Sequence, residues 1–495
     1  MMLTKLKTKF SSIFKGEKGR FVGDIGVKAV AELVNAICGI LIFSIFARAL
    51  TKSDYAVSNQ LITLGTLFAP IILIKINTAY CVFLPGEKDL SKLKSRFFSS
   101  MILSIPSCLI VIALLVFNKS MFSNMMFATY EYSKYMGLIA VYYIFVSLNT
   151  LTQDFYRALG KIKKSSMLVS TNAVLKVIFF ITFMNMQDIF TLQMVLLIYC
   201  LTEFIVLSIS FFGIMKFFKG TPLKIDFSAL KEYYVYSLPL MPYLILSWVN
   251  TSIGRFIINH LVDLESSGIY TFNYSLVVRL FIINTIVGYT IFPYISRFWN
   301  EGNKERVSAY LTKAFNIGVF FGLPITFGLI AVLPTIVSML SGGNYPVDKL
   351  MIGILCISMM FNMIYSVFSY LIDLSRKSVW FTVILLMTSV LNVALNFLLI
   401  PRYQLYGAAI TLMITYFVQA IITIYIGIKS TSVQLKISIG YVIRSLFISL
   451  IMYFLTSVCY QNSGVLNFTV SVLVGIVTYF GLHFAVSKIT HKPII

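Results

Sequence analysis

Charged residues are scarce in this chain. Asp, Glu, Lys and Arg make up 12% of its 495 residues, against about 25% in a typical soluble domain. The three histidines are scattered, and no G-x-x-x-x-G-K-[ST] segment for nucleotide phosphates occurs. This composition excludes a large soluble domain, and it gives no metal, nucleophile or ATP site. We therefore expect neither an enzyme nor a bound cofactor.

Acidic residues are rarer still, 18 against 40 basic ones, so the net charge is +22. Most basic residues lie in short links between apolar runs, a pattern typical of membrane topology and unlike a surface that binds nucleic acid. The six cysteines are scattered in mostly apolar segments without a CxxC pair. We interpret them as packing residues.

Continuous apolar runs of about 20 residues, without period-two alternation, predict membrane-spanning helices and exclude a barrel. The predicted fold is all-α, with about fourteen transmembrane helices. They are placed at 23–49, 55–84, 97–117, 134–157, 165–185, 189–215, 233–260, 267–296, 307–338, 350–373, 377–400, 404–428, 436–458 and 464–487.

The distribution of Lys and Arg predicts the orientation of these helices. With a cytoplasmic N-terminus, the cytoplasmic segments and the helix ends next to them hold 29 basic residues, and the external links with their helix ends hold 6. A missed helix would scramble this alternation, so we expect fourteen helices with both termini in the cytoplasm. The basic segment 1–22 is predicted to be a cytoplasmic tail or an amphipathic helix lying on an anionic leaflet.

Two similar landmarks suggest an internal repeat. "LTKSDYAVSNQL" resembles "LESSGIYTFNYSL" at an offset of 212 residues, and "YRALGKIKKSS" resembles "YLIDLSRKSVW" at 215. We predict two pseudo-symmetric six-helix lobes, 23–215 and 233–428, joined by a cytoplasmic linker at 216–232 and followed by a helix pair within 429–495. Parallel repeats of this kind often enclose a transport path at their interface.

The basic residues inside the predicted spans include Lys28, Lys75, Lys176, Arg255 and Arg279. A basic residue costs at least about 2.5–3.5 kcal/mol at the bilayer centre. Four of these five residues lie on the first two helices of the lobes and are predicted to line a cationic cavity: Lys28, Lys75, Arg255 and Arg279. Polar and aromatic residues on the same helices would contact a ligand: Asn250, Ser252, Trp248 and Tyr274. Glu32 is a candidate for ion coupling.

Structural roles compete with these assignments. Asp24, Lys28 and Glu32 have the spacing of pairs on one helix face, and Lys75 could extend to the interface. Arg255 could pair with Asp263 or Glu265. Lys176, the fifth cation, lies off the predicted path and could join two helices.

The segment "NVALNFLLIPRYQLYGAAITLMITYFV", which begins at Asn392, resembles a signature of Wzx-type polysaccharide flippases in the multidrug/oligosaccharidyl-lipid/polysaccharide exporter superfamily. "SSGIYTFNYSL" and "FYRALGKIKKSS" resemble two further segments of that family. Gln404 replaces a glycine that is common in it, and Ala56 replaces another. The resemblance implies a MATE-like and MurJ-like fold.

The resemblance also implies a bacterial inner membrane as location and an undecaprenyl-diphosphate-linked oligosaccharide as substrate. The substrate would be moved by alternating access for O-antigen, capsule or exopolysaccharide synthesis. Membrane lipid, a polymerase and glycosyltransferases would be its partners. It further implies that the last two helices form an accessory pair, in some relatives a lipid groove. A lipid II flippase and a multidrug or cation exporter of the same superfamily are the alternatives.

Overall fold

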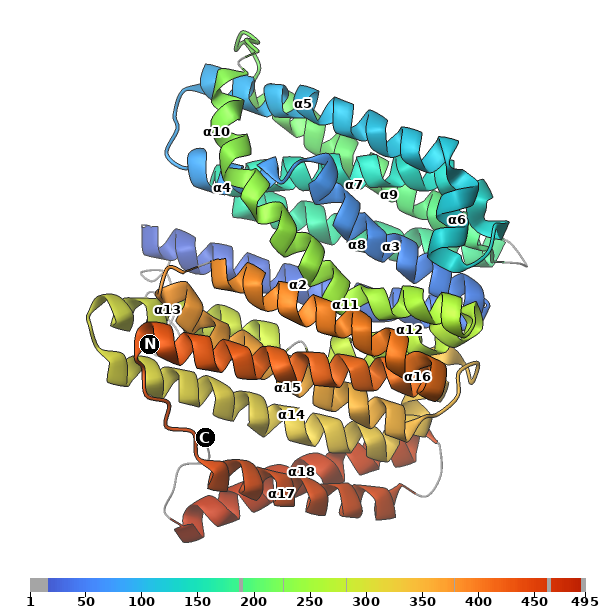
Figure 1. Cartoon of the computed structure of the whole chain (residues 1–495), viewed down its shortest axis with the longest axis vertical. Coiled ribbons are helices and arrows are strands. Elements are labelled where there is room, and N and C mark those ends of the chain that lie inside the picture. Colours follow the sequence, from blue (N-terminus) through green and yellow to red (C-terminus); the bar gives the residue numbers. More distant parts are fainter. Residues whose placement is uncertain are drawn as a thin grey trace, which may run out of the picture. The chain divides into compact units, whose positions relative to one another are not determined.

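The computed structural model describes residues 17–186, 190–225, 227–281, 283–377, 379–460 and 464–490, without the side chains of 17–26, 228–230, 283–290, 293, 465 and 490. Throughout these ranges the chain forms helices joined by short links, and it forms no strand (Figure 1). The predicted all-α fold is therefore confirmed. The first element, α2 (Glu17–Ala49), includes the end of the predicted tail. Residues 1–16 of that tail lie outside the described residues.

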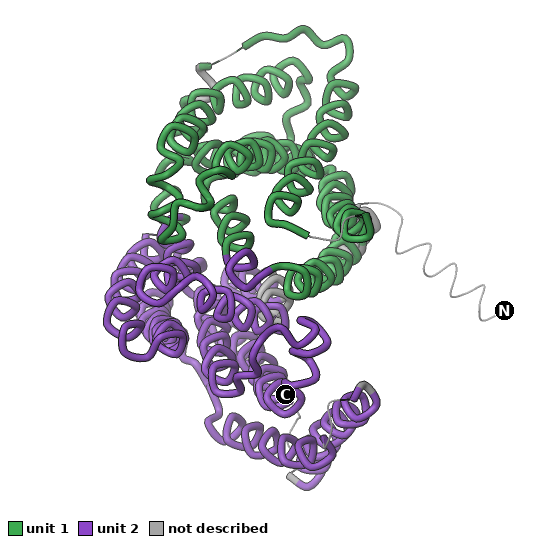
Figure 2. The backbone as a smooth tube through the Cα atoms, turned by 90° about the vertical axis from the view of Figure 1, so that its right-hand side faces the viewer, with its two compact units in different colours: residues 1–50, 57–244 green, residues 51–56, 245–495 purple. Residues whose placement is uncertain are grey.

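The chain divides into two compact units (Figure 2). Unit 1 comprises residues 1–50 and 57–244, and unit 2 comprises 51–56 and 245–495. The division into lobes, linker and accessory pair stays a prediction. The helices that follow α2 in unit 1 are α3 (Lys52–Ile72, which begins in unit 2), α4 (Ile76–Phe83), α5 (Leu90–Phe117), α6 (Lys119–Phe127), α7 (Met136–Ala158), α8 (Ile162–Met186), α9 (Leu192–Phe217) and α10 (Ser228–Ser237).

Unit 2 contains the remaining helices. They are α11 (Met241–Leu261, which begins in unit 1), α12 (Leu264–Leu280), α13 (Ile283–Asn300), α14 (Lys304–Ser341), α15 (Lys349–Leu374), α16 (Val379–Thr431), α17 (Ile439–Cys459) and α18 (Val465–Thr490).

Eleven helices in the described part of the chain are long and apolar enough to cross a membrane. One of them, α16, contains two predicted spans, because its backbone leaves the helical region at Gln404. The predicted spans 233–260 and 267–296 are helical over most of their length, as α11 and as α12 with α13, but they are not among the eleven. The chain is a multi-pass membrane protein.

Two predicted helices are interrupted, and the expectation of continuous helices there was wrong. Ile74 and Lys75 adopt left-handed φ values of 47° and 55°, which separate α3 from α4. The predicted span 267–296 likewise ends one helix at Leu280 and starts the next at Ile283. A β-branched residue in the left-handed region is a backbone outlier that the surrounding packing must hold in place. The apolar sequence around Ile74 gives no sign of this break.

Buried aromatic residues form much of the core of unit 1. The rings of Phe97 and Phe155 lie 4.8 Å apart, and Tyr80 makes an edge contact with Phe155 at 5.7 Å. These contacts join α4, α5 and α7. In addition, Asn77 of α4 donates a hydrogen bond of 2.7 Å to Asp154 of α7. The short helix that follows the break is therefore anchored at several points.

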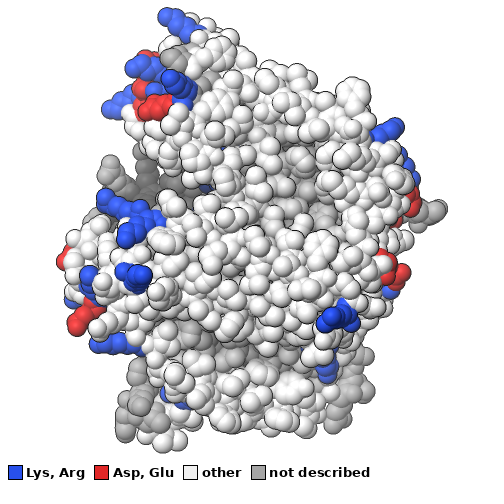
Figure 3. Space-filling view, in the orientation of Figure 1, with Lys and Arg blue, Asp and Glu red and all other residues white. Residues whose placement is uncertain are grey.

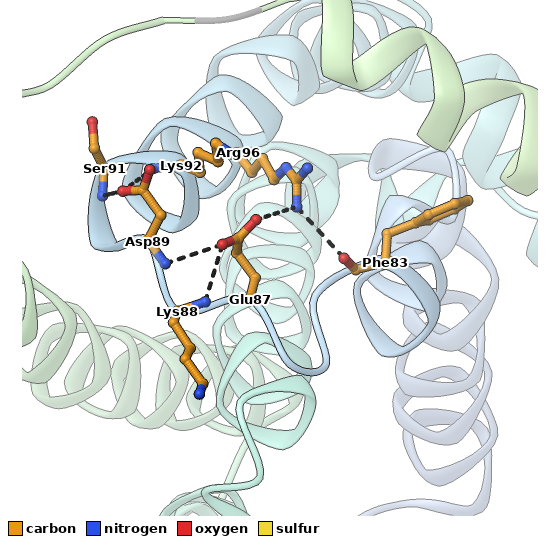
Figure 4. A network of polar contacts seen from close by, with 7 residues as sticks. All are labelled: Phe83, Glu87, Lys88, Asp89, Ser91, Lys92 and Arg96. Atoms are coloured by element: carbon orange, nitrogen blue, oxygen red, sulfur yellow. Dashed lines mark hydrogen bonds and ion pairs between the residues drawn. The ribbon is translucent and has the colours of Figure 1, made fainter.

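The link between α4 and α5 is held by its own polar groups (Figure 4). Glu87 accepts hydrogen bonds of 3.0 Å from the backbone N–H groups of Lys88 and Asp89, and Arg96 lies 3.8 Å from its carboxylate. Asp89 caps α5 by accepting from Ser91 N at 2.8 Å. The hydrogen bond from the Asp89 N–H, aided by the charge of Lys92, lowers the pKa of Glu87 below its ordinary value.

In unit 2, α15 packs along α16, and α17 and α18 form a pair that packs on α14 (Figure 1). Close helix packing in this unit depends on glycine at several places. A Cβ at Gly318 would overlap the side chain of Met363, and one at Gly268 would overlap the backbone of Lys52. Charged side chains on the visible face gather near helix ends, with an almost uncharged surface between them (Figure 3). This pattern suits helices surrounded by lipid.

Candidate substrate-binding site

Arg255 is the central residue of the candidate site in unit 2. It lies on α11, and only 7% of its surface is exposed. Its Nη2 donates to the Ser252 hydroxyl at 3.1 Å, with a longer contact of 3.5 Å to the Thr251 carbonyl oxygen. Its Nε is buried without a hydrogen-bond partner. The guanidinium therefore keeps one buried donor that no described residue satisfies.

Aromatic side chains surround this guanidinium. The ring of Tyr274 on α12 lies 5.3 Å from its Cζ, in a cation–π contact, and Tyr270 stacks beside Tyr274 at 6.2 Å. Tyr416 of α16 is also close enough to interact electrostatically with the charge. Tyrosine faces stabilise a cation without neutralising it.

The acidic residues expected to compete for Arg255 are engaged elsewhere. Glu265 pairs with Lys52 at 2.8 Å. Asp263 caps α12, accepting from the N–H of Ser266 at 2.7 Å and from its hydroxyl at 3.0 Å. Within the described residues no carboxylate oxygen lies within 4 Å of the Arg255 guanidinium. The alternative of a structural ion pair at Arg255 therefore finds no support here.

Arg279 lies on α12 in the last turn before the helix break. Its Nη1 donates to the Ser275 carbonyl oxygen at 2.9 Å, and the residue has further partners. A cation in the last helical turn is stabilised by the carbonyl groups there. Arg279 is thus partly accommodated by its own helix, in contrast to the unsatisfied Nε of Arg255.

The predicted polar and aromatic residues divide between two settings. Ser252 and Tyr274 contact Arg255, as described above. Asn250 instead donates to Thr388 of α16 at 2.9 Å, and its carbonyl oxygen is buried without a partner. Trp248 contacts the ring of Phe256 at 5.4 Å. Two of the four therefore lie at the guanidinium, while Asn250 faces the α16 hairpin.

That hairpin contributes buried polar groups that the sequence analysis did not assign to a site. Asn392 donates to Thr415 at 3.1 Å, and Asn396 donates to the Asn392 side chain at 2.9 Å. The carbonyl oxygen of Asn396 has no partner. The sequence analysis named Asn392 as part of the signature segment. The reversal of the chain at Gln404, seen only in the structure, brings Asn392 to Thr415.

The remaining predicted residues belong to unit 1. Lys28 pairs with Glu32 at 2.6 Å along one face of α2, and their side chains are 45% and 55% exposed. This is the structural pairing anticipated from their spacing, although the side chain of Asp24 lies outside the described residues. Lys75 occupies the break between α3 and α4, with its ammonium 5.8 Å from the ring of Tyr243. The convergence of all four cations on one cavity stays a prediction.

A buried ion pair in unit 1 accounts for Lys176. Its ammonium lies 2.8 Å from Glu203, and the two side chains are 13% and 8% exposed. Asn149 donates to the other carboxylate oxygen at 2.7 Å, and the ring of Tyr199 lies 4.5 Å from the ammonium. This cluster joins α7, α8 and α9, in agreement with the structural role considered for Lys176.

An apolar groove of about 300 Å³ lies between α14, α17 and α18. Its walls are almost entirely hydrocarbon and include Pro324, Leu329, Met452, Ile476 and Phe480. The sequence predicted the helix pair but could not show that it leaves a groove against α14.

Comparison with known proteins places the chain among proteins of polysaccharide synthesis. Residues 21–299 match the family described as "Polysaccharide biosynthesis protein". The chain is 22% identical over 405 residues to the "Capsular polysaccharide biosynthesis protein CapF" of Staphylococcus aureus, covering 80% of this chain and 96% of the relative.

Solved structures share the fold at low sequence identity. "Lipid II flippase MurJ, inward closed conformation" superposes with a TM-score of 0.74 at 15% identity, covering 94% of this chain and 99% of the other. An inward-facing multidrug resistance MATE family transporter of the MOP superfamily gives a TM-score of 0.67 at 13% identity, covering 82% and 98%. The fold expected from the signature segments is therefore confirmed.

Proposed function

This chain belongs to the polysaccharide biosynthesis protein family, and we propose that it moves undecaprenyl-diphosphate-linked oligosaccharide repeat units from the cytoplasmic to the outer leaflet by alternating access. The observation that carries this proposal is Arg255, a buried guanidinium without a carboxylate partner among the described residues. A protein keeps such a group at membrane depth at a cost. Binding an anionic ligand there would offset that cost.

A lipid-linked diphosphate suits this site chemically. It carries about two negative charges, and a guanidinium offers donors whose spacing matches phosphate oxygens. The buried Nε of Arg255 has no partner among the described residues, and Ser252 holds Nη2 in place. Tyr270 and Tyr274 offer aromatic faces and hydroxyl groups to the first sugar. We assign Arg279 and Lys75 supporting roles along the route and keep Lys28 as a weaker candidate, because Glu32 neutralises it.

The lipid chain needs a different environment. The groove between α14, α17 and α18 is apolar, which suits an isoprenoid segment. We propose that part of the undecaprenyl chain rests there while the remainder stays in the bilayer. Substrate delivery and removal by glycosyltransferases and a polymerase of the inner membrane would complete the pathway.

The membrane potential offers a driving force. Moving about two negative charges outward is favoured by about 2.3 kcal/mol per charge per 100 mV when the inside is negative. We propose that this coupling, without ATP, drives export. Glu32 as an ion-coupling site is the second possibility, and its pairing with Lys28 makes it the weaker one. A flipping rate in proteoliposomes that ignores an imposed potential would overturn the first proposal.

Genetic complementation tests the function. Wild type should restore surface polysaccharide in a strain lacking its repeat-unit flippase, whereas Arg255→Ala should not, at equal membrane abundance. Restoration of growth in a strain depleted of lipid II flippase would favour that alternative instead. Active extrusion of cationic dyes would favour a drug exporter, a function that the positively charged site disfavours.

A further inference from the structure

The sharp reversal of α16 has an unusual residue at its tip. Gln404 adopts φ 50° and ψ −126°, between two antiparallel arms joined by the Asn392–Thr415 hydrogen bond. The arms approach so closely that a Cβ at Gly407 would overlap the carbonyl group of Leu399. The turn is thus fixed by packing on both sides.

This conformation is one that glycine adopts without strain and that other residues disfavour. Glutamine at this position therefore destabilises the turn relative to glycine. Strained positions of this kind concentrate where a side chain has a function. The Gln404 side chain is exposed and lines a pocket, so this pocket is where such a function would lie.

The pocket has a volume of about 480 Å³ and lies between the hairpin tip and the first turns of α15. Three consecutive side chains at its rim have no partner among the described residues: Arg402, Tyr403 and Gln404. Tyr403 is 53% exposed. The pocket rim therefore presents an exposed aromatic face, an unpaired guanidinium and a free amide next to one another.

One lining residue of the pocket, Tyr406, is fixed in position. Tyr406 donates to Asp348 Oδ2 at 2.8 Å, and Asp348 Oδ1 accepts from Met351 N at 2.9 Å. Asp348 thereby joins the start of α15 to the hairpin. A ligand entering the pocket would meet a preorganised surface and would have to order only the three rim side chains.

We propose that this pocket binds a sugar ring that carries a negatively charged substituent. Tyr403 would stack on the ring, Gln404 would hydrogen-bond its hydroxyl groups, and Arg402 would pair with the anionic group. Under the predicted topology the pocket faces outside, where the saccharide arrives after transport. The site is separate from Arg255 in sequence and chemistry, and it does not depend on the identity of the lipid.

Binding by the full-length protein in detergent tests this inference. The probe is a soluble tetrasaccharide of alternating glucuronic acid and N-acetylglucosamine, followed by saturation-transfer NMR and by titration. We expect binding to wild type, with at least about a tenfold loss in Arg402→Gln and in Tyr403→Ala. Tyr130→Ala, an exposed tyrosine on the link after α6, is the matched control and should bind as wild type does. Unchanged affinity in Arg402→Gln and Tyr403→Ala would overturn the proposal.

Gln404→Gly gives the sharpest separation between binding and folding. It relieves the backbone and removes the amide, so we expect a higher unfolding temperature together with weaker binding. A lower unfolding temperature, or full affinity, would contradict the inference.

Two competitors identify the ligand class. Neutral N-acetylglucosamine tetrasaccharide should bind more weakly than the charged probe. Displacement of the probe by inorganic phosphate alone, at equal concentration, would indicate an anion site and would refute sugar recognition. Because Arg255 does not line this pocket, Arg402→Gln and Tyr403→Ala should weaken probe binding by the same factor in an Arg255→Gln background, so failure here is distinguishable from failure of the transport proposal.

Discussion

Replacing Arg255 with methionine separates a transport role from a structural one. Methionine retains much of the length and apolar character of the side chain while removing the charge. Removal of a cation from membrane depth recovers about 2.5–3.5 kcal/mol on insertion scales. Against this, the contact with Tyr274 is worth about 0.5–2 kcal/mol. The hydrogen bond from the charged group to Ser252 is worth about 1.5–3 kcal/mol.

These contributions roughly balance, so the stability of Arg255→Met should lie close to that of wild type. The missing carboxylate partner is the reason: no buried anion is left uncompensated by the substitution. Transport should respond differently. Loss of a charge-assisted bond of about 1.5–3 kcal/mol to the diphosphate corresponds to roughly 10- to 150-fold slower flipping.

The assay compares thermal unfolding in detergent with flipping of a fluorescent lipid-linked oligosaccharide in proteoliposomes. Arg255→Lys retains the charge but loses the planar fork, and it should be intermediate. Ser252→Ala removes the group that holds Nη2 and should reduce the rate less than Arg255→Met. Normal flipping by Arg255→Met, or its failure to fold, would refute the reasoning.

Three further predictions concern stability. Lys176→Met should lower the free energy of unfolding by about 3–5 kcal/mol, because it leaves the buried Glu203 charge uncompensated. Adding Glu203→Leu should recover most of this loss. Thermal unfolding measures both effects. Acidification should loosen the link between α4 and α5, because the pKa of Glu87 is lowered in the folded protein. The stabilising effect of its carboxylate is present above the ordinary pKa of a glutamate and is lost as the pH falls below about 4. Hydrogen exchange of residues 84–90 would detect the change. Gly268→Ala should cost about 1–3 kcal/mol because its Cβ overlaps the Lys52 backbone, whereas Gly39→Ala, which meets no atom, should not.

Much of the fold could be predicted from the sequence, because lipid leaves the backbone few choices. Continuous apolar runs identified the helices, and the signature around Asn392 to Ala409 indicated the fold. The breaks at Ile74–Lys75 and after Leu280 could not be predicted. Both occur inside apolar runs, where the conformation depends on tertiary packing and not on local preference.

The candidate site was partly predictable for a similar reason. A lone arginine in an apolar run is conspicuous, so Arg255 was found directly. Whether it had a partner depended on Asp263 and Glu265, which are close to it in the sequence. In the structure Asp263 caps α12 and Glu265 pairs with Lys52. Spacing predicted the Lys28–Glu32 pair, whereas the partner of Lys176 lies 27 residues away on another helix.

The central claim is that Arg255 recognises the diphosphate. Native mass spectrometry of the purified full-length protein with undecaprenyl diphosphate and undecaprenyl monophosphate tests it directly. The account predicts that wild type prefers the diphosphate and that Arg255→Met binds the two lipids about equally while remaining folded. An unchanged preference for the diphosphate in Arg255→Met would contradict it.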